Sequence, residues 1–265
     1  MSFLLHFILQ HGNKIFNQFE QESVVAVAKG ERKTFTEIIS ERILEFKGMS
    51  EAELYEKFSI NSKAKGKNST LIRTMLGLTG DLDKTQEFQK ANMNLRVIRV
   101  DKNGLPKEDS PFKNYNFKEL ATNDDWEESH PYQEICNKRF MFVIFKEVAP
   151  KLFVLDRVKF WGFPDRLETE VKRVWQETRQ ILVGGVKLNQ NGNKISTNFP
   201  QSKINKIIFT KIHAQNTLYE LKSGEFVGKG KLSDTDELPD GRHITKHSFW
   251  IPKKFLKEVL DGKWD

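Results

Sequence analysis

Helical and strand-like patterns alternate along this 265-residue chain, which predicts an α/β (α+β) fold with a mixed central sheet flanked by helices. Three segments carry the prediction. Segment 167–183 repeats apolar residues at helical spacing, segment 93–100 alternates as a strand does, and segment 140–145 is continuously apolar, as a buried central strand is. Hydrophobic residues make up 38% of the chain, which suffices for the core of one large domain.

The other elements follow from local signals. Thr34 with Glu37, and Ser50 with Glu53, have the spacing of capping boxes, in which each side chain bonds the other residue's backbone at a helix start. Gly48 ends the first of these helices. We expect further helices over about 35–47, 50–58, 69–78 and 252–260, strands over 204–212 and 249–251, and a hairpin of 152–154 and 158–161 that turns at Asp156-Arg157.

The composition excludes some classes of protein. Cys136 is the only cysteine, so the chain is not a secreted fold held by internal disulfides. The apolar run 3–9 is too short to span a bilayer and follows no basic segment, so we expect a buried helix there and neither a signal peptide nor membrane attachment. A cytoplasmic location follows as an expectation.

The charges are segregated along the sequence. The net charge is +7, and the isoelectric point is near 9.2. Segments 57–80, 178–219 and 241–257 carry basic residues and no acids, while segment 119–134 carries only acids. Basic stretches of this kind favour a polyphosphate partner, because each neutralised phosphate releases counterions. The alternative is a solvated basic face without a partner.

Several motifs, taken in order, resemble the MutH family of GATC-specific DNA nucleases, and more closely the C-terminal half of the Sau-three-A-I type of restriction endonuclease. Each motif is short, and their order and spacing over roughly residues 40–260 make the resemblance specific. They lie at 50–61, 73–78, 117–121 with 126–129, 139–143, 171–175 and 247–251.

The resemblance implies a MutH-like DNA-binding domain over 35–265, preceded by a linker or helical segment over 1–34. Restriction enzymes of this type carry two MutH-like halves, of which the first holds the active site and the second keeps the fold and binds DNA. The implied partners are double-stranded DNA and the catalytic half of the same enzyme, and a dimer is possible.

The resemblance also locates the family's Mg²⁺-dependent phosphodiester chemistry, which needs one acid, then a second acid two residues before a lysine. These positions fall on Glu87, Asn94 and Arg96 here. Asn94 is neutral, and Arg96 stays charged and cannot act as a base. We therefore expect no intact catalytic site, no metal site and no cofactor for this chain. Glu220-Leu221-Lys222 repeats the second half of the motif by chance, since no acid lies nearby in the preceding segment.

The family's sequence-reading loop matches segment 210–216, where Lys211, His213, Gln215 and Asn216 could contact DNA. Lysine can donate to guanine, and glutamine or asparagine can pair with adenine. Lys211 and Ile212 replace an arginine and a proline of the family pattern, which leaves GATC specificity open. In the basic loop 61–68, the side chains expected to contact phosphates irrespective of sequence are Lys63, Lys65 and Lys67.

Three hypotheses remain open from the sequence. The first is a catalytically silent recognition or effector lobe of a type II restriction endonuclease that binds GATC-like duplex DNA. The second is an active Mg²⁺-dependent endonuclease that uses Glu87 with substitute ligands. The third is a scaffold that dimerises and does not bind DNA.

Overall fold

A sheet of order β1-β3-β4 separates two hydrophobic cores in the computed structural model, which describes residues 33–64, 66–192 and 194–265. β1 runs parallel to β3, and β3 runs antiparallel to β4. The bounds are β1 (Met93–Val100), β3 (Arg139–Ala149) and β4 (Leu152–Gly162). The strand predicted over 93–100 is confirmed residue for residue, and the apolar run 140–145 lies inside β3.

Side-chain alternation along β3 assigns its residues to the two cores. Phe140, Phe142 and Ile144 face one core, and the intervening residues face the other. A strand that buries both of its faces needs apolar residues throughout, which explains its unbroken run.

Short helices cover one face of this sheet. Their buried residues include Ile39, Ile43, Leu54, Leu71 and Phe88. The helices are α2 (Phe35–Leu44), α3 (Glu51–Lys57), α4 (Lys67–Met75), the 3₁₀ turn η1 (Leu82–Lys84) and α5 (Gln86–Lys90). Both predicted capping boxes are present, at the starts of α2 and α3.

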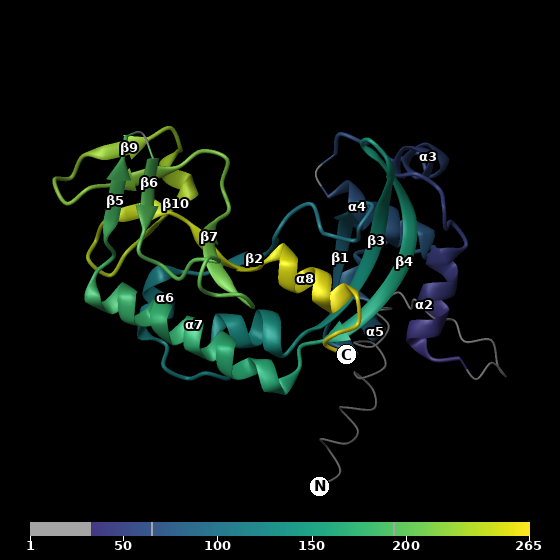
Figure 1. Cartoon of the computed structure of the whole chain (residues 1–265), viewed down its shortest axis with the longest axis horizontal. Helices are drawn as coiled ribbons and strands as arrows, with labels where there is room; N and C mark the ends of the chain where they lie inside the picture. Colours follow the sequence, from purple (N-terminus) through teal and green to yellow (C-terminus); the bar gives the residue numbers. More distant parts are fainter. Residues whose placement is uncertain (1–32, 65, 193) are drawn as a thin grey trace, which may run out of the picture.

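The other face of the sheet packs against the second half of the molecule (Figure 1). A long helix, α7 (Asp165–Gly184), buries the stripe that includes Leu167, Val171 and Trp175. It packs against α6 (Phe117–Thr122) and the π-helical turn η2 (Tyr132–Cys136), and α8 (Lys253–Leu260) adds buried residues to the same core.

Small sheets complete this half. One has the order β2-β12-β7, another β10-β11-β8-β9, and β5 pairs with β6. Their bounds are β2 (Ser110–Asn114), β5 (Leu188–Asn191), β6 (Lys194–Thr197), β7 (Phe209–Ile212), β8 (Leu218–Glu220), β9 (Phe226–Gly228), β10 (Thr235–Glu237), β11 (His243–Thr245) and β12 (His247–Ile251), with a 3₁₀ turn η3 (Leu232–Asp234). The mixed α+β class is thus confirmed.

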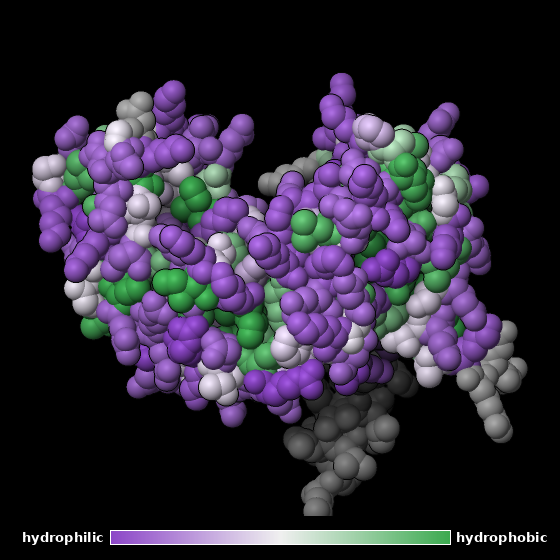
Figure 2. All heavy atoms as spheres, viewed as in Figure 1, coloured by the Kyte–Doolittle hydropathy of each residue, from purple (hydrophilic) through white to green (hydrophobic). Residues whose placement is uncertain are grey.

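The space-filling view shows a notch between the two halves, bordered mostly by hydrophilic side chains, with some hydrophobic ones on its left side (Figure 2). In Figure 1, β2, β7 and α8 lie between the halves, below the notch. Segments from the beginning, the middle and the end of the chain therefore border the notch.

The structure corrects three local predictions. The hairpin expected at Asp156-Arg157 is wrong, because β4 runs straight through these residues. Asp156 has no partner in the register with β3 and forms a bulge, and its carboxylate pairs with Arg157 at 2.6 Å. The strand predicted over 204–212 is shortened to β7, and Lys67 belongs to the first turn of α4, not to the preceding loop.

The helix predicted over the apolar run 3–9 and the contact predicted for Lys65 lie outside the described residues. The division into segments 1–34 and 35–265 stays a prediction. Within the part of the chain that the structure describes, no helix has both the length and the apolar character needed to cross a membrane.

Candidate nucleic-acid interface

Arg96 ties the central sheet to the sheet that contains β2. It lies on the β1 face that Ile98 shares, toward the core formed with the second half. The guanidinium Nη1 donates a hydrogen bond to the Pro111 carbonyl oxygen at 2.7 Å, and the guanidinium carbon lies 4.9 Å from the centre of the Phe112 ring. The cation is thus held against an aromatic ring and a backbone carbonyl of the neighbouring sheet.

Asn94 and Glu87 are the other two positions that the resemblance assigns to the family's catalytic motif. They are near Arg96 in sequence and lie in different environments. Asn94 is half-buried on β1, one pleat before Arg96. Glu87 is half-buried on α5, next to the fully buried Phe88. Among the described residues, the structure contains no group of three or more His, Cys, Asp or Glu side chains arranged to hold a metal ion.

A pocket of about 430 Å³ opens between β1 and segment 106–111. Arg96, Arg99 and Lys107 supply its cations, and Glu108 and Asp109 its carboxylates. Lys107 pairs with Glu147 outside the pocket at 2.9 Å. The lining is therefore mixed in polarity and in charge, and two of its cations, Arg99 and Lys107, are paired with carboxylates outside the pocket.

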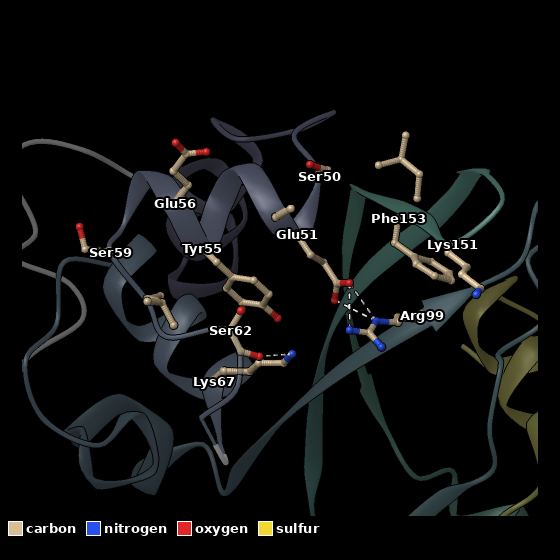
Figure 3. Close-up of a pocket in the computed structure, with 13 residues that line it drawn as sticks. Ser50, Glu51, Tyr55, Glu56, Ser59, Ser62, Lys67, Arg99, Lys151 and Phe153 are labelled. Carbon is tan, nitrogen blue, oxygen red and sulfur yellow. Dashed lines mark hydrogen bonds and ion pairs between the residues drawn. The ribbon is translucent and has the colours of Figure 1, made fainter.

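A second pocket of about 560 Å³ lies beside the first and shares Arg99 and Phe153 with it (Figure 3). Arg99 donates to both carboxylate oxygens of Glu51, from Nε at 2.9 and 3.0 Å. The guanidinium also lies 5.5 Å from the Phe153 ring centre. The pair joins α3 to β1 and forms the wall between the two pockets.

Lys67 and Tyr55 line the far side of this second pocket (Figure 3). The Lys67 ammonium donates to the Ser62 carbonyl oxygen at 2.7 Å and lies 5.1 Å from the Tyr55 ring centre. The Tyr55 hydroxyl donates to Asn68 Oδ1 at 2.6 Å, and burial raises the pKa of Tyr55, so the phenol keeps its proton at neutral pH. The Lys67 ammonium is thus held between a backbone carbonyl and an aromatic ring.

Lys211 extends the first pocket toward β7. Its Nζ lies 3.6 Å from Asp109 Oδ2 and 4.8 Å from the Trp250 ring centre. The Trp250 indole donates to the Lys211 carbonyl oxygen at 3.1 Å, and the His213 ring packs edge-on against the indole at 5.2 Å. Trp250 therefore orders the start of the predicted reading loop, and Asp109 places Lys211 at the rim of the pocket.

The structure brings together some of the predicted site residues and separates others. Lys67, Arg96 and Lys211 lie in or beside the connected pockets. Gln215, Asn216 and His213 are exposed on the loop beyond β7, and Lys63 is exposed in the loop before α4, so none of these lines either pocket.

Sequence reasoning missed Arg99 and Lys107. Both lie outside the three acid-free segments, because Asp101 follows Arg99 closely and Glu108 and Asp109 directly follow Lys107. A signal was available, since Arg99 follows Arg96 on a strand and Lys107 follows the turn at Gly104.

The motif at 247–251 has a structural role. All of its residues are buried in β12. The His247 Nδ1 lies 2.8 Å from the Thr245 carbonyl oxygen, and burial lowers the pKa of His247 to about 4. This imidazole is neutral at physiological pH and is not a DNA contact.

Comparison with known proteins relates the chain to the type II restriction endonucleases. No family model matches the chain. The sequence is 28% identical over 254 residues to the type II restriction enzyme Sau3AI of Staphylococcus aureus. The matched region covers 86% of this chain and 52% of that enzyme. The chain therefore spans about half the length of this curated relative.

Proposed function

We propose that this chain is the DNA-binding lobe of a type II restriction endonuclease, that it recognises GATC-like duplex DNA, and that it does not cleave DNA itself. In this proposal it corresponds to the C-terminal, MutH-like half and acts as a recognition or allosteric effector domain. Its partners are double-stranded DNA and the catalytic half, with dimerisation possible. The relationship to Sau3AI over about half of that enzyme supports this assignment.

The position of Lys211 carries the DNA-binding part of the proposal. The predicted reading residue lies at the rim of a pocket whose other cations come from β1 and segment 106–111. Lys67 lies on the far side of the adjoining pocket. In this proposal Lys211 reads base edges, and the cations of the two pockets bind phosphates.

The contacts of Arg96 support the absence of cleavage. A lysine at this position would help to position or activate a water molecule, whereas the Arg96 guanidinium is fixed on Pro111 and Phe112. Asn94 offers a neutral amide where a carboxylate would bind Mg²⁺, with the Arg96 charge on the same face of the strand. This donor set does not suit Mg²⁺, and we propose that the chain uses no metal.

Fluorescence anisotropy with two short duplexes, one containing GATC and one scrambled, tests the proposal across a salt series. We expect tighter binding to the GATC duplex and a steep loss of affinity with salt. Equal binding to both duplexes would indicate that the chain binds the DNA backbone and does not recognise the sequence. No binding to either would reject the DNA-binding proposal and favour the scaffold.

The alternative is an active Mg²⁺-dependent endonuclease. The half-buried carboxylate of Glu87, on the helix that precedes β1, is the observation that favours it. Plasmid nicking with Mg²⁺ at high protein concentration decides between the two. Cutting that Glu87→Gln abolishes would establish the alternative, and intact plasmid would support the silent lobe.

A further inference from the structure

Segment Gly228–Lys231 is held against the backbone that follows the predicted reading loop. The backbone N–H groups of Lys229 and Gly230 both donate to the Thr217 carbonyl oxygen, at 2.8 and 2.9 Å. Thr217 comes directly after Asn216, the last residue of the loop. The end of the loop is therefore joined to a second segment by two hydrogen bonds to one acceptor.

The glycines of this segment allow the close approach. A Cβ atom on Gly228 would lie 2.0 Å from the Thr217 carbonyl oxygen, and Gly228 has a φ of +128°. A Cβ atom on Gly230 would lie 2.9 Å from the Thr217 carbonyl carbon and 3.1 Å from the Asn216 carbonyl oxygen. Contacts this short are with backbone atoms, which cannot rotate away, so both positions require glycine.

The opposite side of the same backbone is also fixed. The Thr245 hydroxyl accepts from the Leu218 N–H at 2.8 Å and donates to the Leu218 carbonyl oxygen at 2.9 Å. Leu218 begins β8, which pairs with both β9 and β11. The loop end is thus held by hydrogen bonds between Thr245 and segment 228–231.

Lys229 and Lys231 alternate with the two glycines, and both are exposed. Among the residues that the structure describes, neither ammonium group forms an ion pair. The Asp234 carboxylate accepts the Lys231 backbone N–H at 3.1 Å and forms no ion pair with the Lys231 ammonium. The Lys246 ammonium also contacts this turn, where it donates to the Ser233 carbonyl oxygen at 2.9 Å.

We propose that Lys229 and Lys231 bind backbone phosphates of the duplex that the reading loop contacts, and that Gly228 and Gly230 set the distance between these lysines and the loop. This inference rests on the proposed DNA binding and adds a binding segment outside the family's reading loop. Unpaired ammonium groups on a fixed backbone suit phosphodiesters, which lysine binds as a point charge without reading sequence.

The test measures the salt dependence of duplex binding by anisotropy for the double variant Lys229→Ala/Lys231→Ala. Each phosphate contact contributes about 0.9 to the slope of log affinity against log salt, so the slope should fall by about 2. The loss should be similar on the GATC and the scrambled duplex. A matched control, Lys90→Ala/Lys102→Ala, removes two exposed lysines elsewhere and should change the slope little.

A second variant tests the glycines. Gly230→Ala keeps every charge and pushes the segment away from Thr217, so we expect weaker binding, with circular dichroism used to check that the chain stays folded. A slope for the lysine variant equal to that of the control would overturn the inference while leaving DNA binding intact. If the unmodified chain binds neither duplex at any salt concentration, the proposed function and this inference fail together.

Discussion

The ammonium group of Lys211 lies 3.6 Å from the carboxylate of Asp109, and that carboxylate also accepts the backbone N–H of Lys253 at 3.0 Å. Asp109 therefore links β7, the segment before β2 and the start of α8. In the absence of DNA, the carboxylate both orients the predicted reading lysine and partly neutralises it. A phosphate or base that binds Lys211 must compete with this ion pair.

Replacing the carboxylate with an amide should strengthen DNA binding. In Asp109→Asn the amide oxygen can still accept from Lys253, while Lys211 loses its counter-charge. We expect the affinity for duplex DNA at low salt to rise about fivefold, corresponding to roughly 1 kcal/mol. Anisotropy titration measures this. Asp81→Asn, which releases the exposed Lys84, is the matched control, and an equal gain in both variants would show only a change in net charge.

Loss of the reading lysine should reduce specific binding more than loss of a loop lysine. Lys211→Ala removes a cation beside the first pocket, whereas Lys65→Ala removes one from a loop predicted to contact phosphates. We expect Lys211→Ala to reduce the affinity ratio between the GATC and scrambled duplexes, and Lys65→Ala to weaken both by a similar factor. Equal losses on the two duplexes for both variants would contradict this.

Local signals predicted much of the fold. The capping boxes of Thr34 and Ser50 were found because each depends on residues three apart. β1 and α7 were found because their periodicity is strong. These features do not depend on distant parts of the chain.

The errors and omissions come from long-range contacts. The local sequence Asp156-Arg157 is typical of a turn. Pairing with β3 keeps both residues within β4 instead, with a bulge at Asp156. The strand expected from residue 204 begins later, because Asn205 is held by hydrogen bonds with Arg173 and Gln201 instead. In the site, the pairing of Lys211 with Asp109 joins distant parts of the sequence, and no local pattern reports it.

The contacts of Arg96 predict that even the conservative substitution Arg96→Lys destabilises the folded chain. Lysine keeps the charge but lacks the planar guanidinium that lies over Phe112 while donating to Pro111. We expect Arg96→Lys to lower the free energy of unfolding by about 1–2 kcal/mol. Urea denaturation measures it, with the exposed Arg139→Lys as control. An unchanged midpoint would show that the guanidinium does not stabilise the junction between β1 and β2.

Buried His247 predicts how stability depends on pH. Burial lowers its pKa in the folded chain from 6.5 to about 4, so between these values the unfolded chain binds the extra proton. A depressed folded pKa means that the stabilisation is full above pH 6.5 and is lost as the pH falls toward 4. The expected loss between pH 6.5 and 4.5 is on the order of 2–3 kcal/mol.

Other titrating groups also lower the stability of the folded chain as the pH falls. The variant must therefore be compared with the unmodified chain at each pH. Burial also lowers the pKa of His130. Several carboxylates have lowered pKa values as well, and the folded chain loses the stabilisation that they provide below about pH 4.5. Urea denaturation at pH 6.5, 5.5 and 4.5 should show a smaller decline for His247→Asn than for the unmodified chain. The exposed His213→Asn should follow the unmodified chain. If His247→Asn declines just as steeply, the imidazole is not the group that titrates in this window.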